Sequence, residues 1–208
     1  LSRVVKNIRE AILSYGGEVR FLTQVTDILS EPAGKSRRLT ALQVYDHAAG
    51  KEDTIKTDIA VLAIGHSARD TFSMLLKNEI PMEAKSFAVG VRMEHPQAMI
   101  DEFQYGMKND GTLPPASYKL TENLACGRGV YTFCMCPGGY VVNASSEPGR
   151  LAVNGMSYHD RDGLNANSAV IVTVTPQDYG GTGVLAGMEF QRRLEEAAYR
   201  LGKGRIPV

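Results

Sequence analysis

A short run in the first third of the chain combines residue types that suit the binding of an anionic group. It follows an apolar stretch at residues 59–64 and consists of Gly65, His66, Ser67, Ala68 and Arg69. Glycine allows a sharp turn, Ser67 can cap a helix with Asp70 three places on, and the N–H groups of a helix N-terminus suit a phosphate. His66 has two interpretations, contact with a ligand or stabilisation of the turn. Arg69 opposes the helix dipole and has the charge that an anion requires.

Two cysteines in the second half of the chain have types suited to redox or nucleophilic chemistry. Cys134 and Cys136 are two residues apart, so on a strand their side chains point to the same face. One interpretation is a redox pair or a thiolate nucleophile. The other is a pair of buried, inert thiols. This interpretation is favoured because a disulfide between cysteines two residues apart closes a very tight loop and is strained. Cys126 is too isolated to complete a metal site, and we expect no metal.

Arg92 and His95 lie on a segment where polar and apolar residues alternate. An arginine that points into a pocket can hold a substrate carboxylate through two hydrogen bonds; the other interpretation is a surface position on a strand. Neither residue can be named a general acid or base from the sequence.

A long polar segment follows, and it either lines a substrate site or forms solvated turns. Its polar members are Asn143, Ser145, Ser146, Asn154, Ser157, His159, Arg161, Asp162, Asn165 and Asn167.

The first 80 residues predict the elements that would position the glycine turn. The apolar stretch at residues 59–64 is rich in β-branched residues, which is typical of a strand buried on both faces in a parallel sheet. The other expected elements are a helix over residues 4–15 ended by Gly16 and Gly17, a strand over 19–28, a loop over 32–36, a hairpin of 39–45 and 54–57, and a helix through 71–76.

From about residue 81 the pattern changes to short strands separated by Gly, Asn and Pro, which indicates an antiparallel sheet in a second domain. The expected strands cover residues 87–94, 116–120, 130–136, 140–144 and 169–174, and a helix covers 184–201. The glycine pattern at Gly181, Gly183 and Gly187 resembles that of a dinucleotide-binding loop. Their spacing is one residue too long and residues 176–180 separate them from the strand, which favours a flexible loop before a helix. We divide the chain into residues 1–80 and 81–208.

Composition excludes several classes of protein. The 208 residues carry 23 basic and 23 acidic side chains without a basic cluster, so we expect no nucleic-acid or membrane partner. No apolar run approaches the roughly 20 residues of a membrane span. Three cysteines without a secretory signal fit a reducing cytoplasm. The chain begins in mid-pattern without Met and ends just after a helix, which suggests a piece of a longer protein.

Three motifs in order resemble one family. They are residues 65–70, residues 87–96 and the Cys134-Met-Cys-Pro-Gly-Gly139 run, preceded by a Gly-Gly-Glu-Val strand start and by Ala63-Ile64-Gly65. Together they resemble the middle of the uncharacterised bacterial FAD-dependent, or NAD(FAD)-utilising, dehydrogenases. The resemblance covers nearly the whole chain.

The resemblance implies an α/β fold with an α+β insertion: part of an FAD-binding, Rossmann-like domain carrying an antiparallel domain that covers the flavin and shapes a pocket for a small-molecule substrate. In that family the Gly-rich phosphate loop precedes the matching region and a second flavin segment follows it. FAD would be contacted by Val25, by residues 65–69 and by Pro137, Gly138 and Gly139, with Arg92, Cys134 and Cys136 toward the ring. NAD(P)H is the implied reductant. The chain alone is then an inactive fragment of an oxidoreductase; the alternative is a non-catalytic ligand- or protein-binding module on a flavoprotein scaffold.

Overall fold

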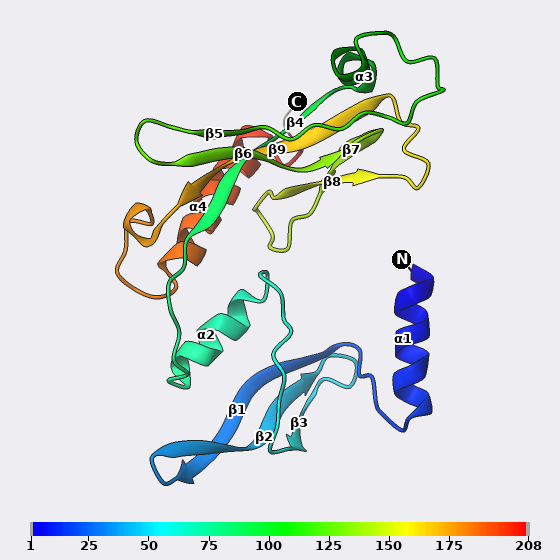
Figure 1. The fold of residues 1–208 in the computed structure, drawn as a ribbon. Helices are drawn as coiled ribbons and strands as arrows, with labels where there is room; N and C mark the ends of the chain where they lie inside the picture. The colour runs from blue at the N-terminus through cyan, green and yellow to red at the C-terminus, as the bar shows by residue number, and fades with distance from the viewer. Residues whose placement is uncertain (1, 207–208) are drawn as a thin grey trace. The chain divides into compact units, whose positions relative to one another are not determined.

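The computed structural model describes residues 2–206 and divides into two compact units, Leu1–Pro81 and Met82–Val208, each of which is described by itself. Pro207 and Val208, which follow the predicted last helix, lie outside the described residues. Every ladder between described strands is antiparallel, and helices and sheets together give an α/β chain with several antiparallel sheets (Figure 1).

The first unit has one sheet in the order β1-β2-β3. Its elements are α1 (Ser2–Ser14), β1 (Thr23–Ala33), β2 (Ser36–Asp46), β3 (Lys51–Lys56) and α2 (Arg69–Lys77). The predicted first helix and the hairpin of β2 and β3 are confirmed. Gly16 ends α1 with φ of 82°, a conformation that glycine adopts without strain.

The first strand differs from its prediction at both ends. Residues 19–22 are not part of it, because the backbone turns at Leu22, whose φ is 52°. The expected loop at residues 32–36 is instead a tight hairpin turn: Ala33 pairs with Ser36 around Gly34, whose φ is 65°.

The predicted buried strand at residues 59–64 is wrong for this chain. The segment has no strand assignment, and Ile59 and Val61 are 75% and 86% exposed. A strand buried on both faces needs a strand at its side and layers above and below it. Among residues 2–206 no strand pairs with this segment, so its apolar side chains stay in solvent.

Helix α2 follows the glycine turn as predicted, but its cap is different. The N-cap residue is Ala68 and no side chain caps it, so the predicted capping box of Ser67 and Asp70 is wrong. Asp70 instead accepts a hydrogen bond from Gln24 Nε2 at 2.6 Å. At the other end Asn78 Nδ2 donates to Asp27 Oδ1 at 2.5 Å, and these two bonds fasten α2 to β1.

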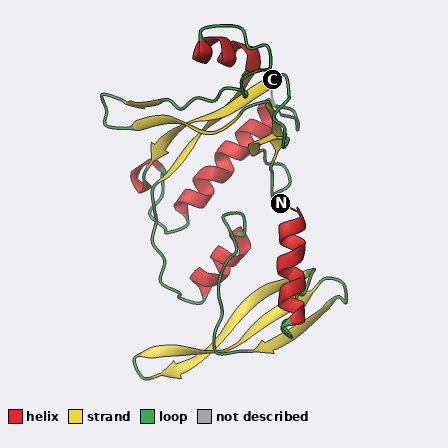
Figure 2. Cartoon of the chain, turned by 45° about the vertical axis from the view of Figure 1, so that its right-hand side comes forward, coloured by secondary structure: helices red, strands yellow, loops and turns green. Residues whose placement is uncertain are grey.

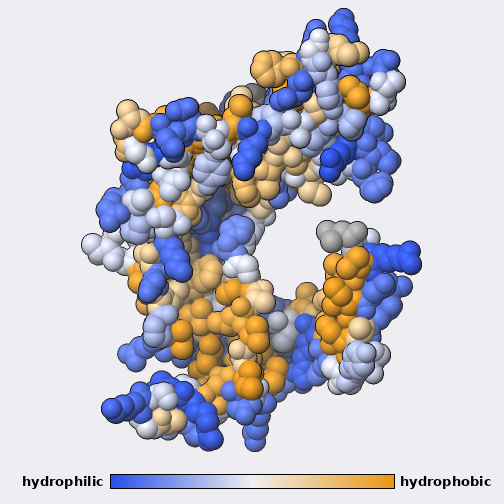
Figure 3. Space-filling model, in the orientation of Figure 1, coloured by the Kyte–Doolittle hydropathy of each residue, from blue (hydrophilic) through white to orange (hydrophobic). Residues whose placement is uncertain are grey.

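Helix α1 has a hydrophobic side that nothing in its unit covers. None of its residues is buried, and Val5 and Ile8 are 60% and 57% exposed. Figure 3 shows hydrophobic atoms gathered along one side of this helix. Exposure of such an apolar face to water is unfavourable, and in folded proteins another surface usually covers it.

The second unit is built on a four-stranded sheet in the order β4-β9-β6-β5, with a separate hairpin of β7 and β8. The elements are β4 (Phe87–Pro96), α3 (Gln97–Tyr105), β5 (Thr121–Asn123), β6 (Gly129–Cys136), β7 (Gly139–Asn143), β8 (Val153–Ser157), β9 (Asn165–Val174), η1 (Pro176–Asp178) and α4 (Ala186–Leu201). Four of the five predicted strands are present. Residues 116–120 are irregular, and α3, β5 and β8 were not predicted.

Two small clusters hold helices against this sheet. Ile100 of α3 packs with Ala116 and Ala166. Along the sheet, where Figure 2 shows α4 running beside it, Phe87 stacks on Tyr179 with ring centroids 5.1 Å apart, and Phe190 of α4 completes the group. Aromatic pairs in these arrangements add stability beyond their buried area.

One of the three dinucleotide-like glycines, Gly187 in the first turn of α4, serves this packing. A Cβ on Gly187 would lie 3.0 Å from the Phe87 ring and 3.1 Å from Tyr179, so this glycine allows α4 to approach the aromatic cluster. The strand before them, β9, pairs antiparallel on both sides, unlike the parallel strand of a dinucleotide fold.

Candidate functional site

The second unit contains a groove of about 1090 Å³ bordered by β4, β7, the segment before β8, and α4. Much of its lining is apolar, and its polar members include Arg92, Glu94, Asn165, Gln191 and Glu195. A concave apolar surface with a few convergent polar groups is the usual form of a small-molecule site.

Arg92 is the cation of this group, and its position is fixed from β4. Its Nη1 donates to Asn167 Oδ1 at 2.6 Å and to the Cys134 carbonyl at 3.1 Å. These bonds connect β4 to β9 and to the bulge in β6. Because a guanidinium has five N–H donors and only Nη1 makes hydrogen bonds to the described residues, the remaining donors suit a carboxylate or phosphate.

Asn167, which accepts the hydrogen bond from Arg92, is completely buried. Its Nδ2 has no hydrogen-bond partner among the described residues. Gly155 of β8 makes room for this pair: an added Cβ would lie 2.1 Å from Asn167 Oδ1 and 2.2 Å from Arg92 Nη1. The packing therefore forces Arg92 and Asn167 into contact.

Glu94 has a structural task beside Arg92. Its Oε1 accepts from Asn165 Nδ2 at 2.6 Å and its Oε2 from the Val141 amide at 2.8 Å, which ties β4 to β9 and to β7. Both carboxylate oxygens are engaged, so Glu94 sets one wall of the groove.

The two cysteines lie in a β-bulge that the sequence did not predict. Pairing of β6 with β9 breaks between Phe133 and Cys136, and Cys134 has a φ of 46°, rare for a residue with a side chain. The simple alternation that places both thiols on one face is therefore interrupted. Cys134 is exposed and Cys136 half-buried, so the expectation of buried thiols is wrong for Cys134. The Cys136 thiol donates to the Cys134 carbonyl at 3.4 Å.

Pro137, Gly138 and Gly139 follow the bulge, and their glycines are explained by packing. Gly138 has a φ of 56°, and a Cβ there would lie 1.8 Å from the Arg161 carbonyl; at Gly139 it would lie 2.2 Å from the Met156 carbonyl. The chain's own backbone fills the space that these glycines leave. Contact of this segment with a flavin stays a prediction.

The Gly138 amide leads to a buried network that sequence reasoning missed. It donates to Gln97 Oε1 at 2.9 Å, and Gln97 Nε2 donates to Asp101 Oδ1 at 2.6 Å. Asp101 also accepts from the Ala116 amide and from Asn109 Nδ2. Burial opposes the ionised carboxylate, but these bonds outweigh it and hold the pKa of Asp101 below its usual value. In the sequence, the only sign of this network is that Gln97 and Asp101 are four residues apart, a spacing that places two side chains on the same face of a helix.

Members of the polar segment divide between sheet and turn. Asn154 and Ser157 lie on β8, and Asn165 and Asn167 lie on β9, where Asn165 borders the groove and Asn167 accepts a hydrogen bond from Arg92. His159, with its acidic and basic neighbours, is exposed in the turn between these strands. Within residues 2–206, no three His, Cys, Asp or Glu side chains come together as a metal site requires.

Of the residues predicted to contact FAD in the first unit, residues 65–69 form an open turn and the start of α2, and Val25 lies on β1. Gly65 has a φ of 67°, and nothing lies within 4 Å of the position of its missing Cβ. His66 and Ser67 are exposed, whereas Arg69 is buried, with 3% of its surface exposed. Val25 is half-buried on β1, paired with Val44 beside a bulge at Thr26.

This turn fits one edge of a dinucleotide site. Nothing lies within 4 Å of the missing Cβ of Gly65, so backbone can approach a ligand there, and helix α2, which begins at Arg69, has first-turn N–H groups of the kind that bind polar ligand atoms. Asp70 in the first turn carries negative charge, however, so the fit favours a polar, uncharged part of a dinucleotide over its phosphates at that point.

The fold is that of an α/β chain whose second unit is antiparallel and contains a groove. Residues 86–208 match the family described as FAD-dependent protein, C-terminal domain-like. The chain therefore belongs to this family of FAD-dependent proteins.

A longer relative extends the comparison to the first unit. An uncharacterized protein of Clostridium beijerinckii is 51% identical to this chain over 206 residues, which is 98% of this chain and 37% of that protein. The chain thus spans a little over a third of the length of the relative. None of the described helices is long and apolar enough to cross a membrane.

Proposed function

We propose that this chain is part of a cytoplasmic FAD-dependent oxidoreductase that acts on a small anionic molecule. The unit Leu1–Pro81 contributes to a Rossmann-like flavin-binding domain, and the unit Met82–Val208 covers the substrate. The observation that carries the proposal is Arg92: in a domain of an FAD-dependent family, a guanidinium with unused donors lies in a groove large enough for a substrate.

The exposed apolar surfaces of the first unit support its place in a larger domain. The segment at residues 59–64 has the composition of a buried parallel strand, and the apolar side of α1 has no cover. Both are accounted for if a parallel sheet from elsewhere in a protein of the relative's length packs against them. Residues 65–69 and Val25 would then border the dinucleotide.

When bound, FAD supplies the acceptance and donation of hydride or electrons. Arg92 would pair with a substrate carboxylate or phosphate, Asn167 and the Cys134 carbonyl would fix its direction, and Glu94 would keep the adjoining strands in place. NADH or NADPH is the proposed reductant.

The test is a flavin titration of the Clostridium beijerinckii relative beside the chain of 208 residues, followed by fluorescence quenching. We expect the longer protein to bind FAD and NADH or NADPH to reduce it, and the shorter chain to bind weakly or not at all. A relative that never takes up flavin would overturn the oxidoreductase proposal in favour of a binding module. Replacing the equivalent of Arg92 by Gln should raise KM for an anionic substrate at least tenfold and leave flavin content unchanged.

A further inference from the structure

A second, smaller cavity of about 340 Å³ lies between α3, β4 and the segment before β5. Apolar side chains from these elements and from β9 form most of its wall: Met93, Met99, Ile100, Phe103, Leu120 and Val170. Met93 and His95 also border the groove of Arg92, so the two hollows are neighbours across β4. Its volume is at the small end of ligand pockets, which suits a single ring.

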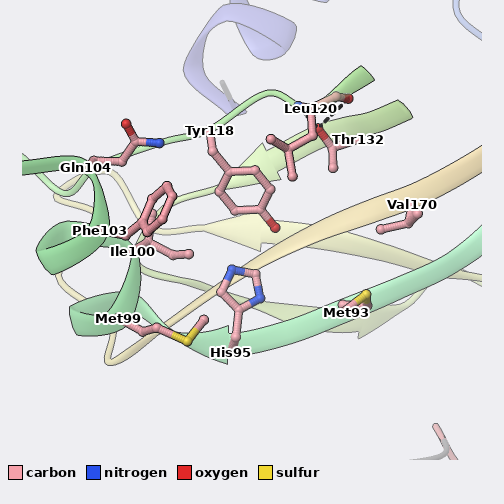
Figure 4. Close-up of a pocket in the computed structure, with 10 residues that line it drawn as sticks. All are labelled: Met93, His95, Met99, Ile100, Phe103, Gln104, Tyr118, Leu120, Thr132 and Val170. Atoms are coloured by element: carbon pink, nitrogen blue, oxygen red, sulfur yellow. Dashed lines mark hydrogen bonds between the residues drawn. The ribbon is translucent and has the colours of Figure 1, made fainter. Parts of the chain in front are cut away.

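Two polar side chains of this cavity have unused hydrogen-bonding groups. Nε2 of His95 is buried and has no hydrogen-bond partner among the described residues, and the Tyr118 hydroxyl makes no hydrogen bond to them. Their ring centroids are 5.6 Å apart, and Figure 4 shows them facing each other inside the cavity. The hydroxyl of Thr132, by contrast, is engaged with the Leu120 backbone. Buried polar groups in native proteins usually have a partner, so the imidazole of His95 points to a ligand, and the Tyr118 hydroxyl is a second group available beside it.

The lining also sets the charge of the ligand. It contains no Lys, Arg, Asp or Glu. Burial lowers the pKa of His95, with Glu94 opposing, so the imidazole is neutral at pH 7 and offers one donor and one acceptor. An anion would have no counter-charge. Two methionines and the Phe103 ring favour an aromatic ring through sulfur and edge contacts.

We propose that this cavity binds a small, uncharged aromatic molecule with one hydroxyl group. The ring lies among Met93, Met99 and Phe103, and the hydroxyl bonds Nε2 of His95 after a small movement of the side chains that bury this atom. This site is separate from the anion site at Arg92 and does not depend on flavin chemistry.

The experiment follows methionine methyl groups by NMR in the full chain, labelled with ¹³C-methyl methionine, with 4-methylphenol as the probe. We expect saturable shifts of the Met93 and Met99 methyls and none at Met156, which lies on β8. Toluene, which lacks the hydroxyl, and benzoate, which is charged, should bind at least several-fold more weakly. Absence of shifts at Met93 and Met99, uniform shifts of all methyls, or equal binding of the three probes would overturn the proposal.

His95→Leu tests the hydroxyl contact, with the exposed His159→Leu as the matched control. We expect His95→Leu to weaken 4-methylphenol about tenfold and to leave toluene unchanged, and His159→Leu to change neither. An unchanged affinity for 4-methylphenol in His95→Leu would overturn the assignment. If that variant does not fold, the ratio of 4-methylphenol to toluene binding in the unaltered chain decides the question.

Discussion

Arg92 Nη1 lies 2.6 Å from Asn167 Oδ1, and Gly155 of a third strand closes over both atoms. A side chain whose partner is fully buried has few alternative positions. The guanidinium is therefore held in place without a ligand, and a ligand that bound it would cause only a small loss of mobility. Such pre-organisation is what the proposed role of Arg92 as a binding arginine requires.

Gly155→Ala should disturb this arrangement directly. The new methyl group would lie about 2 Å from Arg92 Nη1 and Asn167 Oδ1, and overpacking of this kind costs about 1 to 3 kcal/mol of unfolding free energy. Urea unfolding measures the cost. The matched control is Gly183→Ala, since nothing lies within 4 Å of its added Cβ. Equal stability of the two variants would show that the contact is not tight.

Asp101→Asn tests the network that joins α3 to the turn after β6. Both carboxylate oxygens accept hydrogen bonds, from Gln97, Ala116 and Asn109, and an amide would direct an N–H₂ group at one or more of these donors. We expect a loss of about 1 to 3 kcal/mol in unfolding free energy. The exposed Glu122→Gln should cost far less. Thermal unfolding of the two variants side by side makes the comparison.

The sequence predicted elements whose pattern is local. Helix α1, the hairpin of β2 and β3, strands β4, β6, β7 and β9, and helix α4 follow from periodicity and from turn residues. The strand predicted at residues 59–64 is absent because no strand among the described residues pairs with this segment. Composition indicates what a segment would bury; its neighbours decide whether it does.

The candidate site could be predicted only in part. Arg92 and the glycines near residue 138 were named. The reason for glycine at these positions is that backbone from distant parts of the chain lies close to them, and no local sequence pattern encodes such a contact. The bulge at Cys134 was invisible because one extra residue in a strand leaves the composition unchanged. Gln97 was missed, and Asn167 was named only as a member of the polar segment, because a buried amide is recognised by its partners, which lie far away along the chain.

The glycines at positions 65 and 138 should respond differently to alanine, although both have positive φ. At Gly65 the space is open, so the variant should lose only the backbone cost of about 1 to 2 kcal/mol. At Gly138 the Cβ would also lie 1.8 Å from the Arg161 carbonyl, so we expect a larger loss or no folded protein. Chemical denaturation followed by circular dichroism distinguishes them. A Gly138→Ala variant no less stable than Gly65→Ala would contradict the packing explanation for that glycine.

The ion pair of Arg128 and Asp178 should make the second unit sensitive to acid. Arg128 donates to Asp178 Oδ1 and Oδ2 at 2.5 and 2.9 Å, and Thr175 donates from its amide at 2.8 Å. The hydrogen bond from Arg128, followed by the one from the Thr175 backbone, holds the pKa of Asp178 far below the 3.8 of an unperturbed aspartate. The unfolded chain then binds the proton more readily than the folded chain. The stabilisation is complete above about pH 4 to 5 and declines as the pH falls through the unfolded pKa toward the folded one.

Asp178→Asn should remove this part of the pH dependence. The variant should be less stable than the unaltered chain at pH 7, and the difference should shrink as the pH is lowered toward 2, because the aspartate itself becomes protonated. Asp160→Asn, in an exposed turn, is the matched control and should leave the difference between pH 7 and pH 3 unchanged. Urea unfolding at several pH values measures these curves. A stability difference between the unaltered chain and Asp178→Asn that stayed constant from pH 7 to pH 2 would show that the paired carboxylate does not control the acid response.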